Sequence, residues 1–332
     1  PTKSGRLEGE NPFPRFSPSK LICSMDAFSI ILIVVGLFLF ETISSVDNAI
    51  INAEVLSTMG ARARRWFLIW GILFAVFAVR GLLPFLIVWL SVPELGPVGA
   101  ITASFSSDPS VIEAVETAAP LLLMAGGVFL VFLFLHWLFL EPKNYGLYGE
   151  RFFHSQGVWF YAVVSGLLSF IVWQALRVDP FLAFAAVVGS TTFFITHGFK
   201  DNAAAKEKEL MKTGLSDLSK IFYLEVIDAT FSIDGVLGAF AFTLSVPLIL
   251  LGNSLGAIVV RQVTIGNIER IKKYRFLKNG AMYSILFLGM IMLLDGFGFH
   301  IPQWLSPAVT FVAIGYFFFK SKQALNQEYQ GT

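Results

Sequence analysis

The stretch ETISSVDNAI, residues Glu41 to Ile50, lies inside a long apolar segment of the chain. It places two acids and an amide, Glu41, Asp47 and Asn48, where the surrounding residues are those of a membrane helix. A charged side chain at bilayer depth costs several kcal/mol, so such residues usually line a cavity, a proton path or an ion site. These three side chains are therefore the first candidates for function.

Composition indicates the class of protein. Of the 332 residues, 55% are hydrophobic and 14% are charged, and Phe alone occurs 35 times. Several apolar runs are long enough to cross a hydrocarbon core of about 30 Å at about 1.5 Å per residue. The sequence therefore predicts an all-α polytopic transmembrane bundle, with the lipid bilayer as a partner. A net charge of +1 argues against nucleic acid, and the single cysteine, Cys23, excludes an internal disulfide.

About nine spans are predicted, near residues 28–59, 66–90, 118–140, 157–176, 180–197, 219–243, 246–265, 281–299 and 303–319. They divide the chain into five parts: a polar tail (1–27), a first three-helix repeat (28–140), a linker with two transmembrane helices and a charged connector (141–218), a second repeat (219–299), and the last helix with its tail (300–332).

The charges of the connectors predict the orientation. Arginines follow the first span at positions 62, 64 and 65, whereas the connector 91–117 has no Lys or Arg. Basic residues return after every odd-numbered span, which the positive-inside rule assigns to the cytoplasm. We expect an integral protein of the bacterial inner (plasma) membrane with its N-terminus outside and its C-terminus cytoplasmic. The basic residues of the N-terminal tail conflict with this orientation, but the four basic connectors outweigh them.

The opening stretch has a partner in the sixth span, DATFSIDGVL, Asp228 to Leu237. Laid under the first stretch, it places Asp228 at Glu41, Ser232 at Ser45, Asp234 at Asp47 and Gly235 at Asn48. The following spans also align, GILFAVFAVR (71–80) with GNSLGAIVVR (252–261), and each ends in an arginine. Spans 1–3 and 6–8 are therefore expected to be two copies of one unit, inverted because five spans separate equivalent helices. Inverted repeats with matching polar breaks are typical of transporters.

On a straight helix, two acids six residues apart point about 120° away from each other. Local unwinding at both motifs, which Ser44, Ser45 and Gly235 favour, would let these side chains face one pocket. The acids and the amide could then converge on one hard-oxygen pocket for Mg²⁺, Ca²⁺ or Mn²⁺. The expected ligands are Glu41, Asp47, Asn48, Glu225, Asp228 and Asp234. In the alternative, the acids pair with Arg80 and Arg261 and fix helix packing.

At these residues the sequence resembles the TerC-type integral membrane family, named after tellurium resistance. The likeness covers roughly residues 25–325. It rests on the paired acidic motifs, on GGVFL (126–130), on FLK (276–278) and on HIP (300–302). The resemblance implies export of manganese, with calcium as a second candidate ion. The chain departs from the family pattern at Gly235, where a hydroxyl is usual, and at His136, where a lysine is common.

We therefore expect a secondary transporter, not an enzyme, that exports a divalent metal cation, Mn²⁺ before Ca²⁺, through a carboxylate-lined site between the two repeats. Arg80 and Arg261 are expected as counter-ions or gating residues, with no tightly bound cofactor. A homo-oligomer is compatible with the sequence. One alternative is a monovalent cation/proton antiporter. The other is a non-transporting membrane scaffold that acts through residues 199–217.

Overall fold

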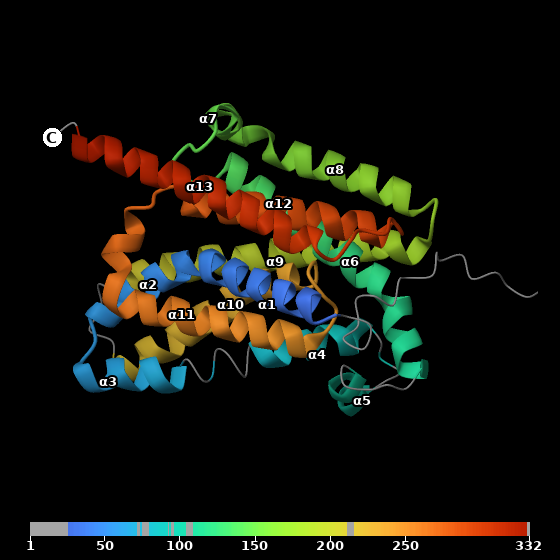
Figure 1. Ribbon diagram of the computed structural model, residues 1–332, viewed down its shortest axis with the longest axis horizontal. Coiled ribbons are helices and arrows are strands. Elements are labelled where there is room, and N and C mark those ends of the chain that lie inside the picture. Colours follow the sequence, from blue (N-terminus) through green and yellow to red (C-terminus); the bar gives the residue numbers. More distant parts are fainter. Residues whose placement is uncertain are drawn as a thin grey trace, which may run out of the picture.

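The computed structural model describes residues 26–71, 74, 80–91, 93, 96–103, 109–210 and 216–330. Within these ranges the secondary structure is entirely helical, which confirms the all-α class (Figure 1). The part before residue 140 contains α1 (Ala27–Ser44), α2 (Val46–Ser57), α3 (Ala61–Trp66), the π-helix η3 (Phe67–Gly71), α4 (Arg80–Ser91), α5 (Gly96–Ala103) and α6 (Pro109–Phe139). The remainder contains α7 (Tyr148–Ser155), the 3₁₀-helix η6 (Gly157–Trp159), α8 (Phe160–Ala175), α9 (Pro180–Leu210), α10 (Asp217–Ala239), α11 (Val246–Lys272), α12 (Leu277–Gly296) and α13 (Leu305–Gln330).

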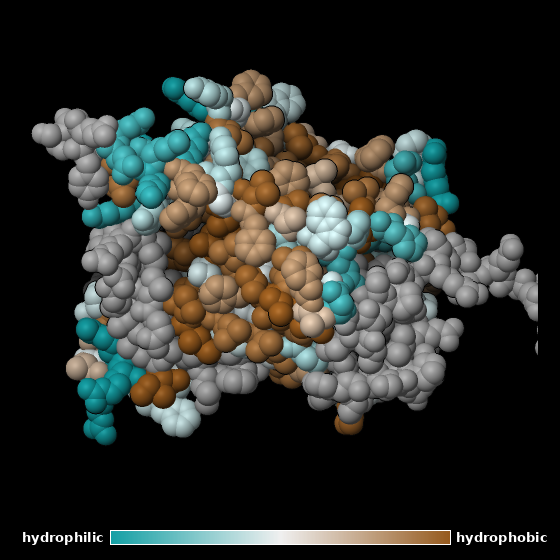
Figure 2. Space-filling model, in the orientation of Figure 1, coloured by the Kyte–Doolittle hydropathy of each residue, from teal (hydrophilic) through white to brown (hydrophobic). Residues whose placement is uncertain are grey.

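Five segments of the described chain are long and apolar enough to cross a membrane, as an integral membrane protein requires. They are Ala27–Ser44, Thr117–Phe139, Gly157–Ala175, Pro180–Lys200 and Leu277–Gly296. The other predicted spans are helical where they are described but are shorter, interrupted or more polar; α10, for example, carries several charged residues. Figure 2 shows apolar side chains across the middle of the visible face and hydrophilic ones gathered at its two ends.

Helix α6 is the centre of the bundle. Most of its apolar stretch is buried, and it packs against α12 and α9. Small residues bring α6 and α12 together, because Gly126 lies against Met292 and Gly289 lies against Leu130 and Val131. From the first of these contacts to the second, the residue numbers rise in α6 and fall in α12, so the two helices are antiparallel.

Helix α1 packs mainly on α11, which runs parallel to it (Figure 1). Gly252 of α11 lies against Leu37, and Gly256 lies against Glu41. Helix α10 crosses the same part of α1 in the opposite direction. At the far end of α10, Lys220 donates to the hydroxyl of Thr58 at 3.1 Å, just after α2.

Three boundaries differ from the sequence expectation. The predicted first span is divided at Ser45 into α1 and α2, whereas α10 runs without interruption through the second motif. The helix is therefore broken at the first motif and continuous at the second. The connector 91–117, interpreted from the sequence as an extracytoplasmic loop, contains α5 and the first turns of α6. The connector expected at 199–217 begins as a continuation of α9 to Leu210.

Candidate functional site

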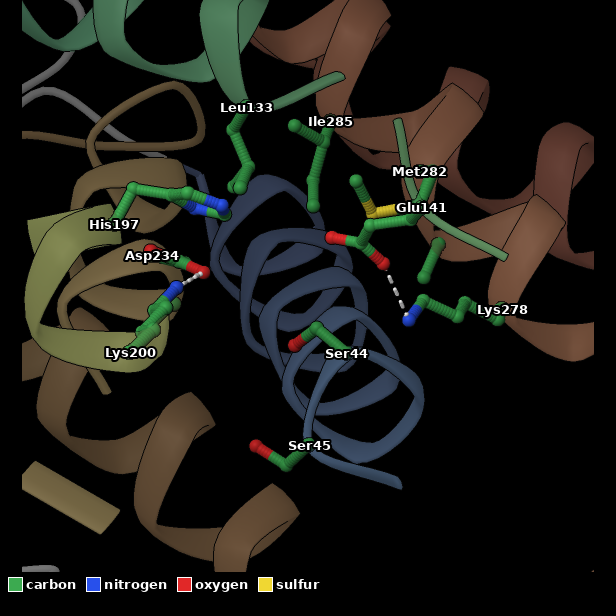
Figure 3. A pocket seen from close by; sticks show the side chains of 12 residues that line it. Ser44, Ser45, Leu133, Glu141, His197, Lys200, Asp234, Lys278, Met282 and Ile285 are labelled. Carbon is green, nitrogen blue, oxygen red and sulfur yellow. Dashed lines mark hydrogen bonds and ion pairs between the residues drawn. The ribbon is translucent and has the colours of Figure 1, made fainter. Parts of the chain in front are cut away.

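A cavity of about 90 Å³ opens beside the junction of α1 and α2 (Figure 3). Four further helices, α6, α9, α10 and α12, and the connector after α6 contribute to its wall, so it lies where widely separated parts of the sequence meet. It is lined by Ser44, Ser45, Leu133, Glu141, His197, Lys200, Asp234, Gly235, Lys278, Ala281, Met282 and Ile285.

Serine hydroxyls accompany the interruption of the first membrane helix. Ser45 has φ −86° and ψ 1°, which ends α1, and α2 begins at the next residue. Its hydroxyl donates to Oε1 of Glu41 at 2.6 Å, and the Ser44 hydroxyl lies 3.4 Å from the Glu41 carbonyl. Serine side chains compete for the backbone acceptors of a helix, as Ser44 does here, so the polar pair favours a break at this point.

Glu41 lies in a cradle formed by two glycines of neighbouring helices. Its side chain is 1% exposed. A Cβ atom at Gly235 of α10 would lie 2.6 Å from Oε2, and one at Gly256 of α11 would lie 2.7 Å from Cβ of Glu41. Any larger residue at either position would displace the carboxylate or separate the helices. Glycine thus permits α1, α10 and α11 to meet around one buried acid.

Asp234, one of the two acids that line the cavity, forms an ion pair with Lys200 of α9 through its Oδ2 atom. The two side chains are only 16% and 10% exposed. Asp234 was predicted as a site residue, but Lys200 was expected in a cytoplasmic connector. The sequence signal was the position of Lys200 directly after the apolar run of α9, where a charged residue is carried into the bundle.

A second ion pair lies across the cavity, on the other side of α1 in Figure 3. The Lys278 ammonium is 2.8 Å from Oε2 of Glu141, and Nδ1 of His136 is 3.7 Å from Oε1. Burial raises the pKa of the Glu141 carboxyl, but the neighbouring His136 and Lys278 outweigh it and hold that pKa well below its usual range. The rings of His136 and His197 lie 3.6 Å apart between their centroids. Sequence reasoning did not assign Glu141, Lys278 or His197 to the site.

The remaining acids of α10 lie away from the cavity. Asp228 is 4% exposed, and Glu225 lies against Gly71 of η3. Along a continuous helix, Asp228 is about 9 Å from Asp234 and Glu225 about 14 Å, on different faces. These three acids therefore do not converge on one ion in this conformation. The side chains of Asp47, Asn48, Arg80 and Arg261 lie outside the described residues.

In the side chains that are described, no group of three or more His, Cys, Asp or Glu is arranged to hold a metal ion. The cavity instead combines two carboxylates with two ammonium groups and an imidazole. Such a site can bind a cation once one of its own ammonium groups withdraws from its carboxylate.

Residues 46–328 match the protein family described as "Protein of unknown function (DUF475)", and the chain belongs to this family. No curated protein and no solved structure matches the chain.

Proposed function

We propose that this protein is a secondary transporter that exports a divalent metal cation, with Mn²⁺ as the expected substrate and Ca²⁺ as the next candidate. The observation that supports it best is the buried carboxylate of Glu41 at an interrupted membrane helix, against Gly235, which directly follows the Asp234 that pairs with Lys200. Buried acids in a membrane bundle mark ion pathways. Carboxylate and hydroxyl oxygens are ligands that Mn²⁺ and Ca²⁺ accept.

The arrangement of the two sequence copies supports alternating access. Helices α1 and α10 carry equivalent motifs and cross in opposite directions, since Gly235 lies against Glu41 and Gly238 lies against Phe40. Helices α6 and α12, the third members of each copy, are also antiparallel. The aligned glycines Gly71 and Gly252 also make equivalent contacts, because each lies against the first helix of the other copy. Gly252 lies against α1, and Gly71 lies against α10. An axis in the membrane plane would relate the copies in this way.

Lys200 supplies the counter-ion of Asp234. Its ammonium neutralises Asp234 when no cation is bound, which removes the cost of an unpaired buried charge. An entering divalent cation would take Asp234 and Glu41 as ligands and displace the ammonium. Lys200 is thus the counter-ion of Asp234 in this arrangement, and Arg80 and Arg261 stay proposed as counter-ions or gating residues. The predicted orientation places the cavity toward the cytoplasm, the side from which an exporter loads.

The resemblance to the TerC-type family supports the same substrate class.

The one-to-one pairing of Lys200 with Asp234 supports the alternative, a monovalent cation/proton antiporter, because a single monovalent cation could replace the single ammonium at Asp234. Two transport measurements in vesicles, Ca²⁺ competition and the pH response to Na⁺ or K⁺, distinguish the two proposals. Ca²⁺ should reduce Mn²⁺ flux in a divalent transporter, whereas an antiporter of Na⁺ or K⁺ should acidify or alkalinise vesicles on addition of those ions.

The decisive experiment measures Mn²⁺ flux in proteoliposomes with a metal-sensitive dye. The Lys200→Gln/Asp234→Asn double variant removes both charges at once and should lose flux while remaining folded. The control is Asp179→Asn, which removes a carboxylate from the exposed start of α9, where it accepts the backbone N–H of Phe181. Normal flux in the double variant would refute the site. The scaffold alternative makes the opposite prediction: deleting or recharging residues 199–217 abolishes function, whereas variants of the acids alone keep it.

A further inference from the structure

Equivalent serines in the two copies make different hydrogen bonds. In the first copy, the Ser45 hydroxyl donates to the carboxylate of Glu41 at 2.6 Å, and the helix is interrupted there. In the second copy, the Ser232 hydroxyl donates to the backbone carbonyl of Asp228, also at 2.6 Å, and the helix is continuous. Each serine follows its acid by four residues, so both bonds are available to both pairs.

The two acids share the same kind of environment. Glu41 is 1% exposed and Asp228 is 4% exposed, and Ser232 is itself 1% exposed. A serine carries one hydroxyl proton and can donate to the carboxylate or to the carbonyl, but not fully to both. Donation to a carboxylate is charge-assisted and therefore the stronger of the two bonds. The choice of acceptor thus accompanies the conformation of the helix.

We propose that Ser45 and Ser232 are alternating positioning residues, and that the two copies exchange these conformations between the two states of the transport cycle. In the opposite state, α10 is interrupted at Ser232, whose hydroxyl then holds the carboxylate of Asp228. The first helix is then continuous through Ser45, whose hydroxyl bonds back to the carbonyl of Glu41. This inference rests on the proposed function, since alternating access of inverted copies requires that each adopt the conformation of the other.

Asp228 consequently becomes a second cation station. Glu41 would hold the cation while α1 is interrupted, and Asp228 would hold it while α10 is interrupted. This assignment explains why Asp228 lies apart from the cavity in the present state, where its helix is continuous. It also gives the acid and the serine, which are four residues apart in both motifs of this chain, the same role in each copy.

Hydrogen exchange of the purified protein in nanodiscs, without added metal, tests the inference. Ser45→Ala removes the donor that stabilises the present state. Amides at 46–50 should then exchange more slowly and amides at 233–237 faster, by about fivefold, the factor that one net hydrogen bond contributes to an equilibrium. Ser232→Ala should produce the reverse shift, and Ser45→Thr, which keeps the hydroxyl, should retain the wild-type pattern.

Two matched controls carry the same type of hydroxyl on the same helices. Thr42 donates to the carbonyl of Phe38 at 2.7 Å and Thr230 to that of Val226 at 2.8 Å, but neither follows an acid by four residues. Thr42→Ala and Thr230→Ala should leave the balance between the two segments unchanged. Changes confined to the mutated helix, or reciprocal changes in the threonine variants as well, would overturn the inference.

The outcome is independent of the proposed substrate. Reciprocal exchange shifts in the serine variants of a protein that carries no Mn²⁺ flux would support the conformational exchange and refute the proposed function. Mn²⁺ flux with exchange shifts confined to the mutated helix would keep the function and refute the exchange of roles.

Discussion

The ammonium of Lys200 and the carboxylate of Asp234 form an ion pair that joins α9 to α10 inside the bundle. Both side chains are largely withdrawn from the surface, so neither charge is solvated well when its partner is removed. Asp234 therefore cannot be examined by a single charge-removing substitution without also leaving Lys200 uncompensated.

A double-mutant cycle should reveal this coupling. Lys200→Gln and Asp234→Asn should each destabilise the protein by about 3–5 kcal/mol, the usual effect of removing one partner of a buried ion pair. The double variant should be more stable than either single variant, because it leaves no unpaired charge. Denaturant unfolding in detergent measures all four proteins, and strictly additive effects would show that the two residues do not form a pair in solution.

Gly256 should not tolerate a methyl group. In Gly256→Ala the new Cβ would meet the side chain of Glu41 and lie 2.9 Å from the carbonyl of Phe38, which is backbone and cannot rotate away. Overpacking of this kind costs about 1–3 kcal/mol. Thermal unfolding should show a lower midpoint and, since Glu41 is displaced, flux should fall.

Gly166 of α8 supplies the control for that substitution. A Cβ there would meet nothing within 4 Å. Gly166→Ala should therefore stabilise the protein by about 0.5–1 kcal/mol, the ordinary gain for a helix interior. A Gly256→Ala variant as stable as Gly166→Ala would contradict the close approach of α11 to α1.

Local chemistry made part of the site predictable. Ser44 and Ser45, which follow Glu41 by three and four residues, favour a break in the first span, because serine hydroxyls compete with helical backbone bonds. The same reasoning failed at Ser232, where the hydroxyl bonds back to its own helix and the backbone stays helical. Local sequence offers both outcomes, and tertiary packing selects between them.

Contacts between distant segments were not predictable. Glu141 and Lys278 are far apart in sequence and meet because α6 and α12 pack closely through Gly126 and Gly289. Hydropathy identified both helices as spans but does not say which spans are neighbours. Lys200 was missed for a related reason, since the basic residues that follow it resemble a solvated connector.

The Glu141 carboxyl should make stability depend on pH in the acidic range. Its pKa in the folded protein is held well below the ordinary value of 4.5, so protonation favours the unfolded state. The stability that this group contributes is complete above about pH 5 and declines as pH falls below the unfolded pKa. Thermal unfolding from pH 7 to pH 3.5 should show a smaller decline in Glu141→Gln than in wild type.

Lys278→Gln provides the companion measurement. It removes the ammonium that lies 2.8 Å from Glu141, so the folded pKa of this carboxyl should rise and the pH-dependent decline should also become smaller. An unchanged pH profile in both variants would show that Glu141 is not paired in the folded protein.

The orientation of the chain can be tested with single cysteines in a Cys23→Ser background, where position 23 lies outside the described residues. His300 and Ser216 are both exposed and lie near opposite ends of the bundle. Helix α10 begins at Asp217, near Thr58, and ends near Ser306, whose hydroxyl donates to the carbonyl of Ala241 at 2.7 Å. The positive-inside rule places the Ser216 end in the cytoplasm.

His300→Cys should therefore react with an impermeant maleimide in intact cells, whereas Ser216→Cys should react only after permeabilisation. Tyr148→Cys, in the basic connector after α6, is the matched control and should behave like Ser216→Cys, because Tyr148 is fully exposed. Reaction of His300→Cys and Ser216→Cys from the same side would contradict the antiparallel copies. Reaction of both Ser216→Cys and Tyr148→Cys from outside, with His300→Cys protected, would keep the repeats but reverse the direction of transport, since the cavity would then load from the exterior.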